Sequence, residues 1–308
     1  MNLHLLPPAA STMAGRVDLV FLFLFLSTGI VAGGVALLIV AFAIRYRRGA
    51  KVDRHNPPAG DRVLEVAWIA VPLLIFLVMF AWAAREYVEN YRAPAGAMPV
   101  FVVAKQWMWK VEHRNGHREI DELHVPVGQP VRLVMASQDA IHSFFVPAFR
   151  IKQDVVPGRY TSIWFEATRA GEYPLFCAEY CGSQHSTMRG RIVAMEPAAF
   201  AQWLAQGAVR GGTAARGFDL YRRYGCSGCH EPGSSVHAPD LHGLLGRVVH
   251  LSDGRSLVAD EAYVRDSILL PRKDVVAGYA PIMPSFAGQI AEEDIMAIIE
   301  YLRVGAEL

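Results

Sequence analysis

The chain has 308 residues, of which 53% are hydrophobic and 19% are charged, and its formal net charge is +1. This length fits about two domains. The hydrophobic fraction is high for one soluble domain, and the charged fraction is low for a disordered chain. The near-zero net charge argues against nucleic acid as a partner, because phosphate binding needs a basic surface.

Two long uncharged stretches near the N-terminus predict a pair of membrane-spanning helices. Residues 19–44 and 66–84 contain no charged side chain. As helices they would extend ~39 Å and ~28 Å at ~1.5 Å per residue, enough to cross a lipid bilayer. The segment between them carries six Lys or Arg residues, which predicts that it is cytoplasmic and that the chain after residue 84 lies outside. The alternatives are a cleaved signal peptide for the first stretch and a buried core helix for the second.

The next segment predicts an all-β sandwich or small barrel of about 100 residues. Short β-branched or aromatic runs begin at residues 100, 131, 162 and 191, and turn signals such as Asn115-Gly116 and Pro157-Gly158 separate them.

A change in composition then marks the C-terminal third as a separate helical module. Residues 207–217 are rich in Gly and predict a flexible linker. Residues 218–224 and 292–303 predict helices, the second with apolar side chains on one stripe and three acidic residues in its first turn. Residues 217–308 hold 8 basic and 13 acidic residues, whereas residues 85–216 hold 15 and 12. We therefore expect the acidic module to dock on the cationic segment before it.

The densest group of metal-binding side chains lies in Cys177-Ala-Glu-Tyr-Cys181-Gly-Ser-Gln-His185-Ser-Thr-Met188. Thiolates, imidazole and thioether together suit copper, and a thioether is a poor zinc ligand. Two cysteines four residues apart on a turn can each bridge two copper ions, and each ion then needs an imidazole. His185 serves one ion, and His142 is the best candidate for the other. A zinc site or a disulfide is the alternative. We expect His113, His117 and His124 at the surface.

Residues 137–197 resemble cytochrome c oxidase subunit II, a family with two transmembrane helices followed by a cupredoxin domain that holds the binuclear copper centre CuA. The resemblance implies that Cys177 and Cys181 bridge the two coppers and that His142 and His185 bind one copper each. It implies axial ligands from the remaining two residues, Met188 and the main-chain carbonyl of Glu179.

The same resemblance implies roles for three further side chains. The Glu179 side chain would reach a Mg ion at the boundary with oxidase subunit I. Trp107, in Gln106-Trp-Met-Trp109, would receive electrons, although Met108 stands where the family commonly has an aromatic residue. Glu65, at the cytoplasmic start of the second helix, would lie at the mouth of a proton-uptake path. The alternatives are a core aromatic for Trp107 and an interfacial snorkelling residue for Glu65.

The sequence Cys226-Ser-Gly-Cys229-His230 is the attachment pattern of c-type haem, with a zinc or dithiol site as its alternative. The thiols form thioethers with the haem, and the adjacent His becomes an iron ligand. The following stretch resembles class I cytochrome c. That resemblance implies that Met283 is the second axial ligand, that the Pro239 carbonyl holds the His230 ring, and that Arg247 neutralises a haem propionate. Iron with His and Met ligands suits electron transfer rather than oxygen binding.

The two resemblances together match the caa-type oxidases, in which subunit II is fused to a cytochrome c. They imply a multidomain membrane protein with the following parts: a transmembrane hairpin over residues 1–92, an all-β cupredoxin domain over 93–206, a linker over 207–217 and an all-α class I cytochrome c domain over 218–308. Both outer domains would lie on the periplasmic side of a bacterial cell membrane.

By the same resemblance, electrons from a cytochrome c-type donor would pass through haem c and CuA to subunit I. There oxygen is reduced to water with proton pumping, and subunit III is a further expected partner. Two alternatives remain open at this point. One is the electron-input subunit of a CuA-containing nitric oxide reductase, and the other is a free-standing membrane electron-transfer or copper protein.

Overall fold

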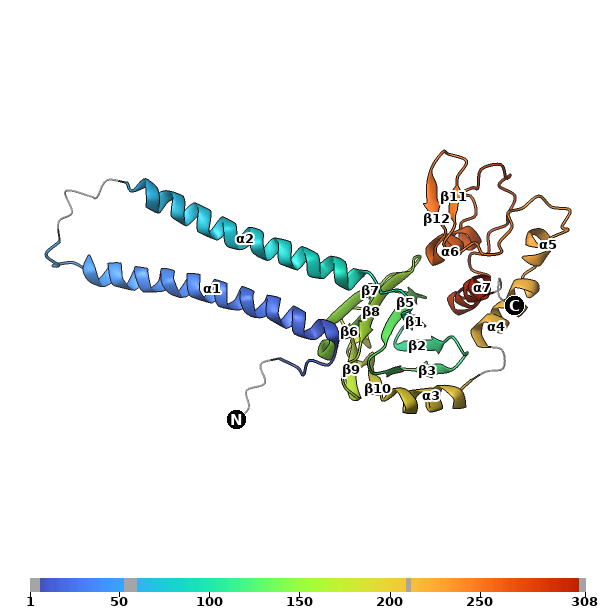
Figure 1. The fold of residues 1–308 in the computed structure, drawn as a ribbon, viewed down its shortest axis with the longest axis horizontal. Helices are drawn as coiled ribbons and strands as arrows, with labels where there is room; N and C mark the ends of the chain where they lie inside the picture. Colours follow the sequence, from blue (N-terminus) through green and yellow to red (C-terminus); the bar gives the residue numbers. More distant parts are fainter. Residues whose placement is uncertain (1–5, 53–59, 209–211, 305–308) are drawn as a thin grey trace. The chain divides into compact units, whose positions relative to one another are not determined.

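The computed structural model describes residues 6–52, 60–208 and 212–304, and it falls into two compact units. One unit is a pair of helices over residues 12–92, and the other comprises residues 1–11 and 93–308. The second unit contains a β-sandwich and a C-terminal helical module, joined within the same unit (Figure 1).

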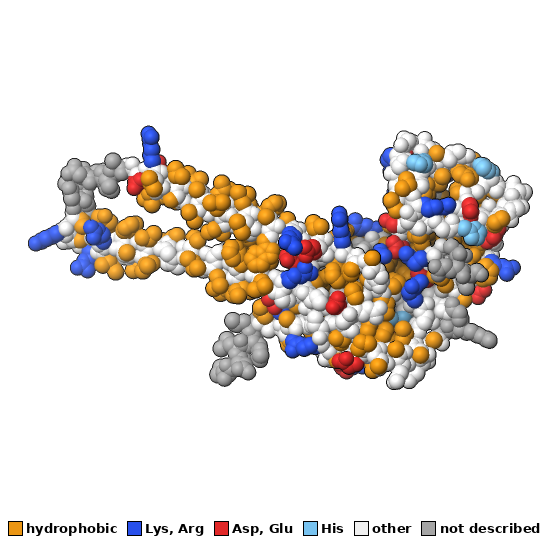
Figure 2. Space-filling view, viewed as in Figure 1, with side chains coloured by type: hydrophobic (Ala, Val, Ile, Leu, Met, Phe, Trp, Pro, Cys, Tyr) orange, Lys and Arg blue, Asp and Glu red, His pale blue; other side chains and the backbone are white. Residues whose placement is uncertain are grey.

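The first unit is a helical hairpin of α1 (Thr12–Arg45) and α2 (Arg62–Tyr91), both long and apolar enough to cross a membrane. On the face that Figure 2 shows, hydrophobic side chains are spread along both helices. No residue in the most apolar part of either helix is buried. This disagrees with the alternative that the second stretch is a buried core helix. Both helices extend beyond the uncharged stretches, and in α2 the extension contains an ion pair one turn apart, Arg85 to Glu89 at 2.9 Å.

The predicted all-β domain is a sandwich of two five-stranded sheets. The first has the order β3-β2-β1-β5-β8 and the second β4-β10-β9-β6-β7. The strands are β1 (Met98–Lys105), β2 (Met108–His113), β3 (Arg118–Ile120), β4 (Glu122–Pro126), β5 (Pro130–Ser137), β6 (His142–Val146), β7 (Ile151–Val155), β8 (Thr161–Glu166), β9 (Gly171–Cys177) and β10 (Arg189–Met195).

The register of two strands brings distant residues of the second sheet to one place. Strand β6 pairs with β9 so that Phe144 lies opposite Cys177. His142 is two residues before Phe144 and therefore points to the same face of the strand. Phe144 is fully buried and contacts Trp109 of the first sheet edge to face, with ring centroids 5.3 Å apart. This aromatic contact between the sheets supports the end of the sandwich where His142 and Cys177 meet.

The C-terminal module consists of helices around one apolar core, with a short hairpin of β11 (Val248–His250) and β12 (Ser256–Val258). Its helices are α4 (Gly212–Arg223), α5 (Ser227–His230), α6 (Glu261–Leu269) and α7 (Glu292–Val304). The predicted amphipathic helix over 292–303 is confirmed as α7, and the side chains of its apolar stripe are buried.

Helix α4 starts inside the stretch 207–217 that its composition predicts as a linker. The reason is a close helix crossing: a Cβ on Gly217 would lie 1.9 Å from the Ala297 carbonyl oxygen of α7. The glycines that suggest flexibility therefore serve, in this part, to let two helix backbones touch. A further helix, α3 (Pro197–Gln206), follows β10 and was not predicted.

Candidate copper and haem sites

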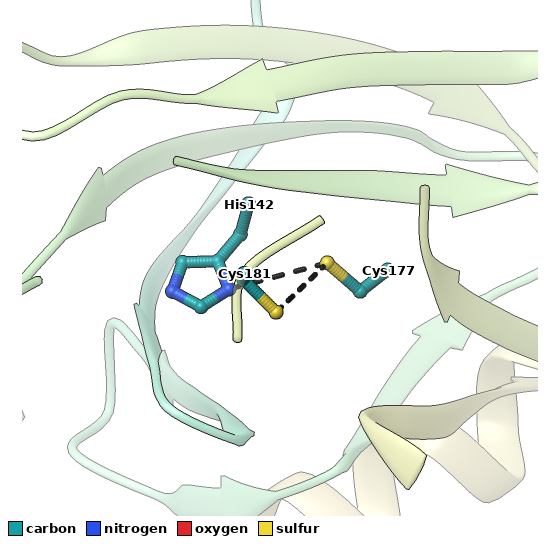
Figure 3. A group of neighbouring side chains, drawn as sticks. All are labelled: His142, Cys177 and Cys181. Atoms are coloured by element: carbon teal, nitrogen blue, oxygen red, sulfur yellow. Dashed lines mark hydrogen bonds between the residues drawn. The ribbon is translucent and has the colours of Figure 1, made fainter. Parts of the chain in front are cut away.

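Six candidate ligands gather at one end of the sandwich, supplied by β6, the end of β9 and the loop before β10. The two thiol sulfurs of Cys177 and Cys181 lie 3.8 Å apart. His142 Nδ1 lies 4.0 Å from the Cys177 sulfur, and His185 Nδ1 lies 3.6 Å from the Cys181 sulfur. Each imidazole therefore faces a different sulfur. Figure 3 shows His142 and the two thiols converging.

Two weaker donors complete this cluster. The Met188 sulfur lies 3.8 Å from the Cys181 sulfur, and the main-chain oxygen of Glu179 accepts from the Cys177 thiol at 3.2 Å. Both cysteines, Met188 and His142 are buried. The thiols are free, and a separation of 3.8 Å is far beyond the ~2.05 Å of a disulfide bond.

The pKa values of the two thiols shift in opposite directions, and this favours a positively charged ion between the sulfurs. Burial disfavours the Cys177 thiolate, but the neighbouring imidazole of His142 and nearby backbone groups outweigh it and lower the pKa to about 6. Burial and the charge of Cys177 raise the pKa of Cys181 to about 12. The pair thus yields one thiolate readily and the second only against repulsion, which a metal bridging both sulfurs would relieve. Soft sulfur, imidazole and thioether donors fit copper.

Polar side chains that the sequence did not predict hydrogen-bond to these candidate ligands and hold them in place. Asp139 Oδ1 lies 2.8 Å from His142 Nε2, the ring nitrogen that faces away from the sulfur. The side-chain amide of Gln106 donates to the Cys181 carbonyl at 2.8 Å, and the Trp107 indole donates to the same oxygen at 3.3 Å. Such partners orient ligating rings and are often as important as the ligands. The spacing of Asp139, three residues before His142, is the signal that could have revealed it.

The three remaining predicted residues occupy different environments. Trp107 is half-buried beside the Cys181 carbonyl, so its indole adjoins the sulfur cluster. The Glu179 side chain is exposed. Glu65 lies in the first turn of α2, in the other unit, and is also exposed.

The C-terminal module contains a cavity of about 710 Å³ with a mainly apolar lining. All six residues predicted around the haem line it: Cys226, Cys229, His230, Pro239, Arg247 and Met283. His230 Nδ1 lies 2.8 Å from the Pro239 carbonyl oxygen, the contact expected of a proximal ligand that turns its other nitrogen to iron. Burial raises the pKa of the Cys226 thiol.

The residues around this cavity fit a covalent c-type haem. Its volume lies within the range of cofactor pockets, and its walls offer two thiols, an imidazole and a thioether in otherwise apolar surroundings. Helices α6 and α7 supply apolar wall residues such as Val264, Ile268 and Ile298. Arg247 is exposed at the edge, where its guanidinium donates to the Asp240 carbonyl at 3.0 Å.

The prediction that His113, His117 and His124 lie at the surface is wrong for His113, which is 2% exposed. Its Nε2 lies 2.8 Å from Glu119, whose other oxygen lies 2.5 Å from His124 Nδ1. The Trp203 ring stacks on both His117 and His124, with centroids 4.2 Å apart in each case. Packing of α3 against the strands therefore buries this group, and α3 itself was not predicted.

Comparison with known proteins gives two family matches in chain order. A model described as cytochrome c oxidase subunit II, periplasmic domain, matches residues 100–195, and a cytochrome c model matches residues 214–305. The cytochrome c oxidase subunit 2 of Thermostichus vulcanus is 30% identical over 260 residues, covering 66% of this chain and 78% of that protein. The subunit 2 of Alkalihalophilus pseudofirmus is 28% identical over 291 residues, covering 86% and 82%.

Among solved structures, the periplasmic domain of subunit II of cytochrome oxidase from Bradyrhizobium japonicum is 28% identical. It covers 38% of this chain and 96% of that chain, with a TM-score of 0.36.

A cupredoxin-like sandwich with a sulfur and imidazole cluster, followed by a helical module with a Cys-x-x-Cys-His cavity, defines a copper- and haem-binding electron-transfer protein. Its two apolar helices make it a membrane protein. The chain belongs to the cytochrome c oxidase subunit II family, carries a C-terminal cytochrome c domain, and is thus a subunit of a haem–copper oxidase.

Proposed function

We propose that this chain is the electron-input subunit of a caa-type cytochrome c oxidase, which passes electrons from a covalent haem c to CuA and on to subunit I. The observation that carries the proposal is the presence in one chain of two sites whose donors suit one-electron carriers. One is the six-donor cluster around Cys177 and Cys181, and the other is the thiol-bearing cavity around His230.

At the copper site, Cys177, Cys181, His142, His185 and Met188 would hold the copper. Copper held there would supply a one-electron acceptor. The protein's part is to keep the ligands fixed, because a rigid ligand set lowers the reorganisation that accompanies electron transfer. Burial of Cys181 and Met188 excludes water, and Asp139 holds the His142 ring from the far nitrogen.

At the haem site, Cys226 and Cys229 would attach the macrocycle, and His230 and Met283 would hold the iron. A haem held by His and Met would supply electron transfer rather than oxygen binding. The Pro239 carbonyl fixes the orientation of the His230 ring. The apolar cavity walls favour a hydrophobic macrocycle, and Arg247 at the rim suits a propionate.

The remaining assignments concern partners and location. We infer that Trp107 admits electrons near CuA, that the exposed Glu179 carboxylate meets a Mg ion shared with subunit I, and that Glu65 borders a proton-uptake path. Subunit III and a cytochrome c-type donor complete the proposed assembly. The two helices would lie in the bacterial cell membrane, with the sandwich and C-terminal module on the periplasmic side.

The test uses the intact complex purified through this chain. The expected result is about two coppers and one covalent haem per polypeptide, a large haem-bearing partner subunit, and oxygen consumption driven by a reduced cytochrome. Consumption of nitric oxide in place of oxygen would assign the chain to a reductase. Recovery of the chain with its metals but without a haem-bearing partner would overturn the oxidase assignment.

A further inference from the structure

The outer face of the first sheet is apolar, which is unexpected for a two-layer sandwich. Strand β1 buries both of its faces: Val100 and Val102 alternate with Phe101 and Val103, and all four are at most 4% exposed. Phe101 and Val103 form an outer cluster with two residues of β5, and Met296 of α7 packs on it. The sheet thus offers an apolar surface that the C-terminal module covers.

Ion pairs surround this apolar contact, and most of them have the same polarity. The cation comes from the sandwich and the carboxylate from the module in three pairs: Lys110–Glu293 at 2.7 Å, Arg132–Glu261 at 2.9 Å and Arg114–Glu300 at 2.6 Å. In a fourth pair the polarity is reversed, because Arg216 of α4 pairs with Glu112 of β2 at 2.9 Å. The acidic module and the cationic sandwich therefore complement each other locally as well as in total charge.

A buried arginine of α6 also joins the two parts. The Arg265 side chain is 5% exposed, and its guanidinium donates to the Gly158 carbonyl of the sandwich at 2.6 Å. It lies 5.5 Å from the centre of the Tyr160 ring, and Glu292 of its own module pairs with it. If the two parts separated, Arg265 would lose the carbonyl and the ring together. A contact of this kind favours a lasting interface over a transient encounter.

Helix α7 contacts the sheet with one side and the haem cavity with the other. Glu293, Met296 and Glu300 are spaced by three or four residues and touch the sandwich. Ile298 and Leu302 lie on the opposite side of the helix and line the cavity. The helix therefore stands between the cavity and the sheet.

The first turn of α7 also reaches the loop that leads to the copper cluster. Glu293 accepts from the Gln138 amide at 2.7 Å. Gln138 precedes Asp139, whose carboxylate holds the His142 ring. A short polar path thus joins the module to a candidate copper ligand.

We propose that the C-terminal module is permanently seated on the outer face of the first sheet, with α7 between its haem cavity and the sheet. The seat consists of the Met296 contact, the four ion pairs and the Arg265 contact. The module is a fixed part of the molecule and does not swing on its tether. The seat stands independently of the redox role. Its consequence, that the haem and CuA keep one separation during turnover, rests on the proposed function.

The test measures the accessibility of Met296 in the full chain within its complex. Met296 is 2% exposed because the sheet covers it, whereas Met108 of the sandwich is half-buried. Dilute hydrogen peroxide oxidises accessible methionines, and peptide mass spectrometry measures each rate. In a seated module Met296 is oxidised at least about tenfold more slowly than Met108. Equal rates for the two residues would overturn the proposal.

A charge exchange tests the same surface without removing any apolar contact. Lys110→Glu places a carboxylate against Glu293, and the oxidation of Met296 should become several-fold faster. Adding Glu293→Lys restores an opposite-charge pair and should restore most of the protection. Arg191→Glu, which disrupts an exposed pair with Glu122 elsewhere on the sandwich, is the matched control and should change nothing. A double variant as accessible as the single one would contradict the seat.

These results are separable from the proposed function. Protection of Met296 depends only on the packing of the two parts, whereas the metal content and oxygen consumption test the redox assignment. If Met296 were protected in a complex without oxidase activity, the proposed packing would stand and the proposed function would be rejected. An accessible Met296 in an active oxidase would reject the seat alone.

Discussion

At the scale of single residues, Cys181 is the best position for testing the copper site, because it contacts three other candidate ligands. Its sulfur lies within 3.8 Å of Cys177, His185 and Met188. Cys181→Ser replaces a soft bridging donor by a hydroxyl, which binds copper weakly. We expect loss of the seven-line electron spin resonance signal of a shared-valence copper pair, with an unchanged haem spectrum. Ser183→Ala, an exposed change in the same loop, is the control. A surviving seven-line signal would reject the ligand set.

Met283 is the corresponding test position in the cavity of the C-terminal module. Its thioether lines the cavity together with His230. Met283→Ala should open the sixth position of the iron, so that carbon monoxide binds the reduced haem and shifts its absorption band. Met108→Ala, outside the cavity, should leave the haem closed to carbon monoxide. If the Met283 variant were equally unreactive, another residue would have to be the ligand.

Glu261 gives the seat a pH dependence. Burial opposes its charge, but Arg132 at 2.9 Å and Arg303 at 2.6 Å outweigh this effect and lower the pKa to about 2 from 4.5. A lowered pKa stabilises the folded form above pH 4.5, and this contribution, about 3 kcal/mol, is lost as the pH falls towards 2. Two further titratable groups interact with this site: Glu300, which also pairs with Arg303, and Tyr160.

The measurement is the thermal unfolding of the module between pH 6 and pH 2, for the wild type and for Glu261→Gln. The wild type should lose stability more steeply across this range, and the variant should already be less stable at pH 6. Comparison of the two chains removes the contribution of the other carboxylates. Parallel pH profiles would mean that Glu261 carries no such stabilisation.

At the scale of elements, the sequence predicted those whose pattern is local. The uncharged stretches predicted α1 and α2, and the apolar stripe at period 3.6 predicted α7. Helix α4 covers residues 212–217 of the predicted linker, whose residues 209–211 lie outside the described part of the chain, and composition does not reveal what a glycine touches. Gly217 lies at a helix crossing that joins residues 80 positions apart, and only the tertiary structure brings Ala297 to it.

The residues of the two candidate sites could be singled out in the sequence for a related reason. Most lie within short motifs, and His142 required only one long-range assumption. Asp139, Gln106 and the burial of His113 were missed, because a hydrogen bond between distant strands leaves no periodic signal. The assignments of the ligands themselves remain predictions.

The α4–α7 crossing can be tested by adding one methyl group. Gly217→Ala would place a Cβ 1.9 Å from the Ala297 oxygen and 2.8 Å from the Cβ of Tyr301, so the helices must separate. We expect the free energy of unfolding of the module to fall by about 1–3 kcal/mol, the usual cost of overpacking, although Ala has the higher helix propensity. Unfolding followed by haem absorption measures this loss. Gly29→Ala in α1, where a Cβ meets nothing within 4 Å, is the control. A module as stable as the wild type would show that the helices yield without cost.

At the scale of the whole molecule, the charge count predicted that the acidic module docks on the cationic sandwich, and three of the four ion pairs have that polarity. The count did not predict the apolar contact beneath them. Alternation of Phe101 and Val103 with core residues makes β1 apolar on both faces, which sequence alone does not distinguish from a strand buried between two sheets.

A seated module changes the expected kinetics of the whole chain. A tethered carrier that swings must diffuse to its acceptor, so its transfer rate falls as the solvent becomes more viscous. A module held by Met296 and Arg265 makes no such search, and transfer from haem to copper should keep its rate when sucrose raises the viscosity about threefold. Stopped-flow absorbance of the two centres measures this rate directly. The Lys110→Glu variant should become viscosity-dependent, because its module spends part of its time unseated. A wild-type rate that falls in proportion to viscosity would mean that docking, rather than electron transfer across a fixed interface, limits the passage of electrons.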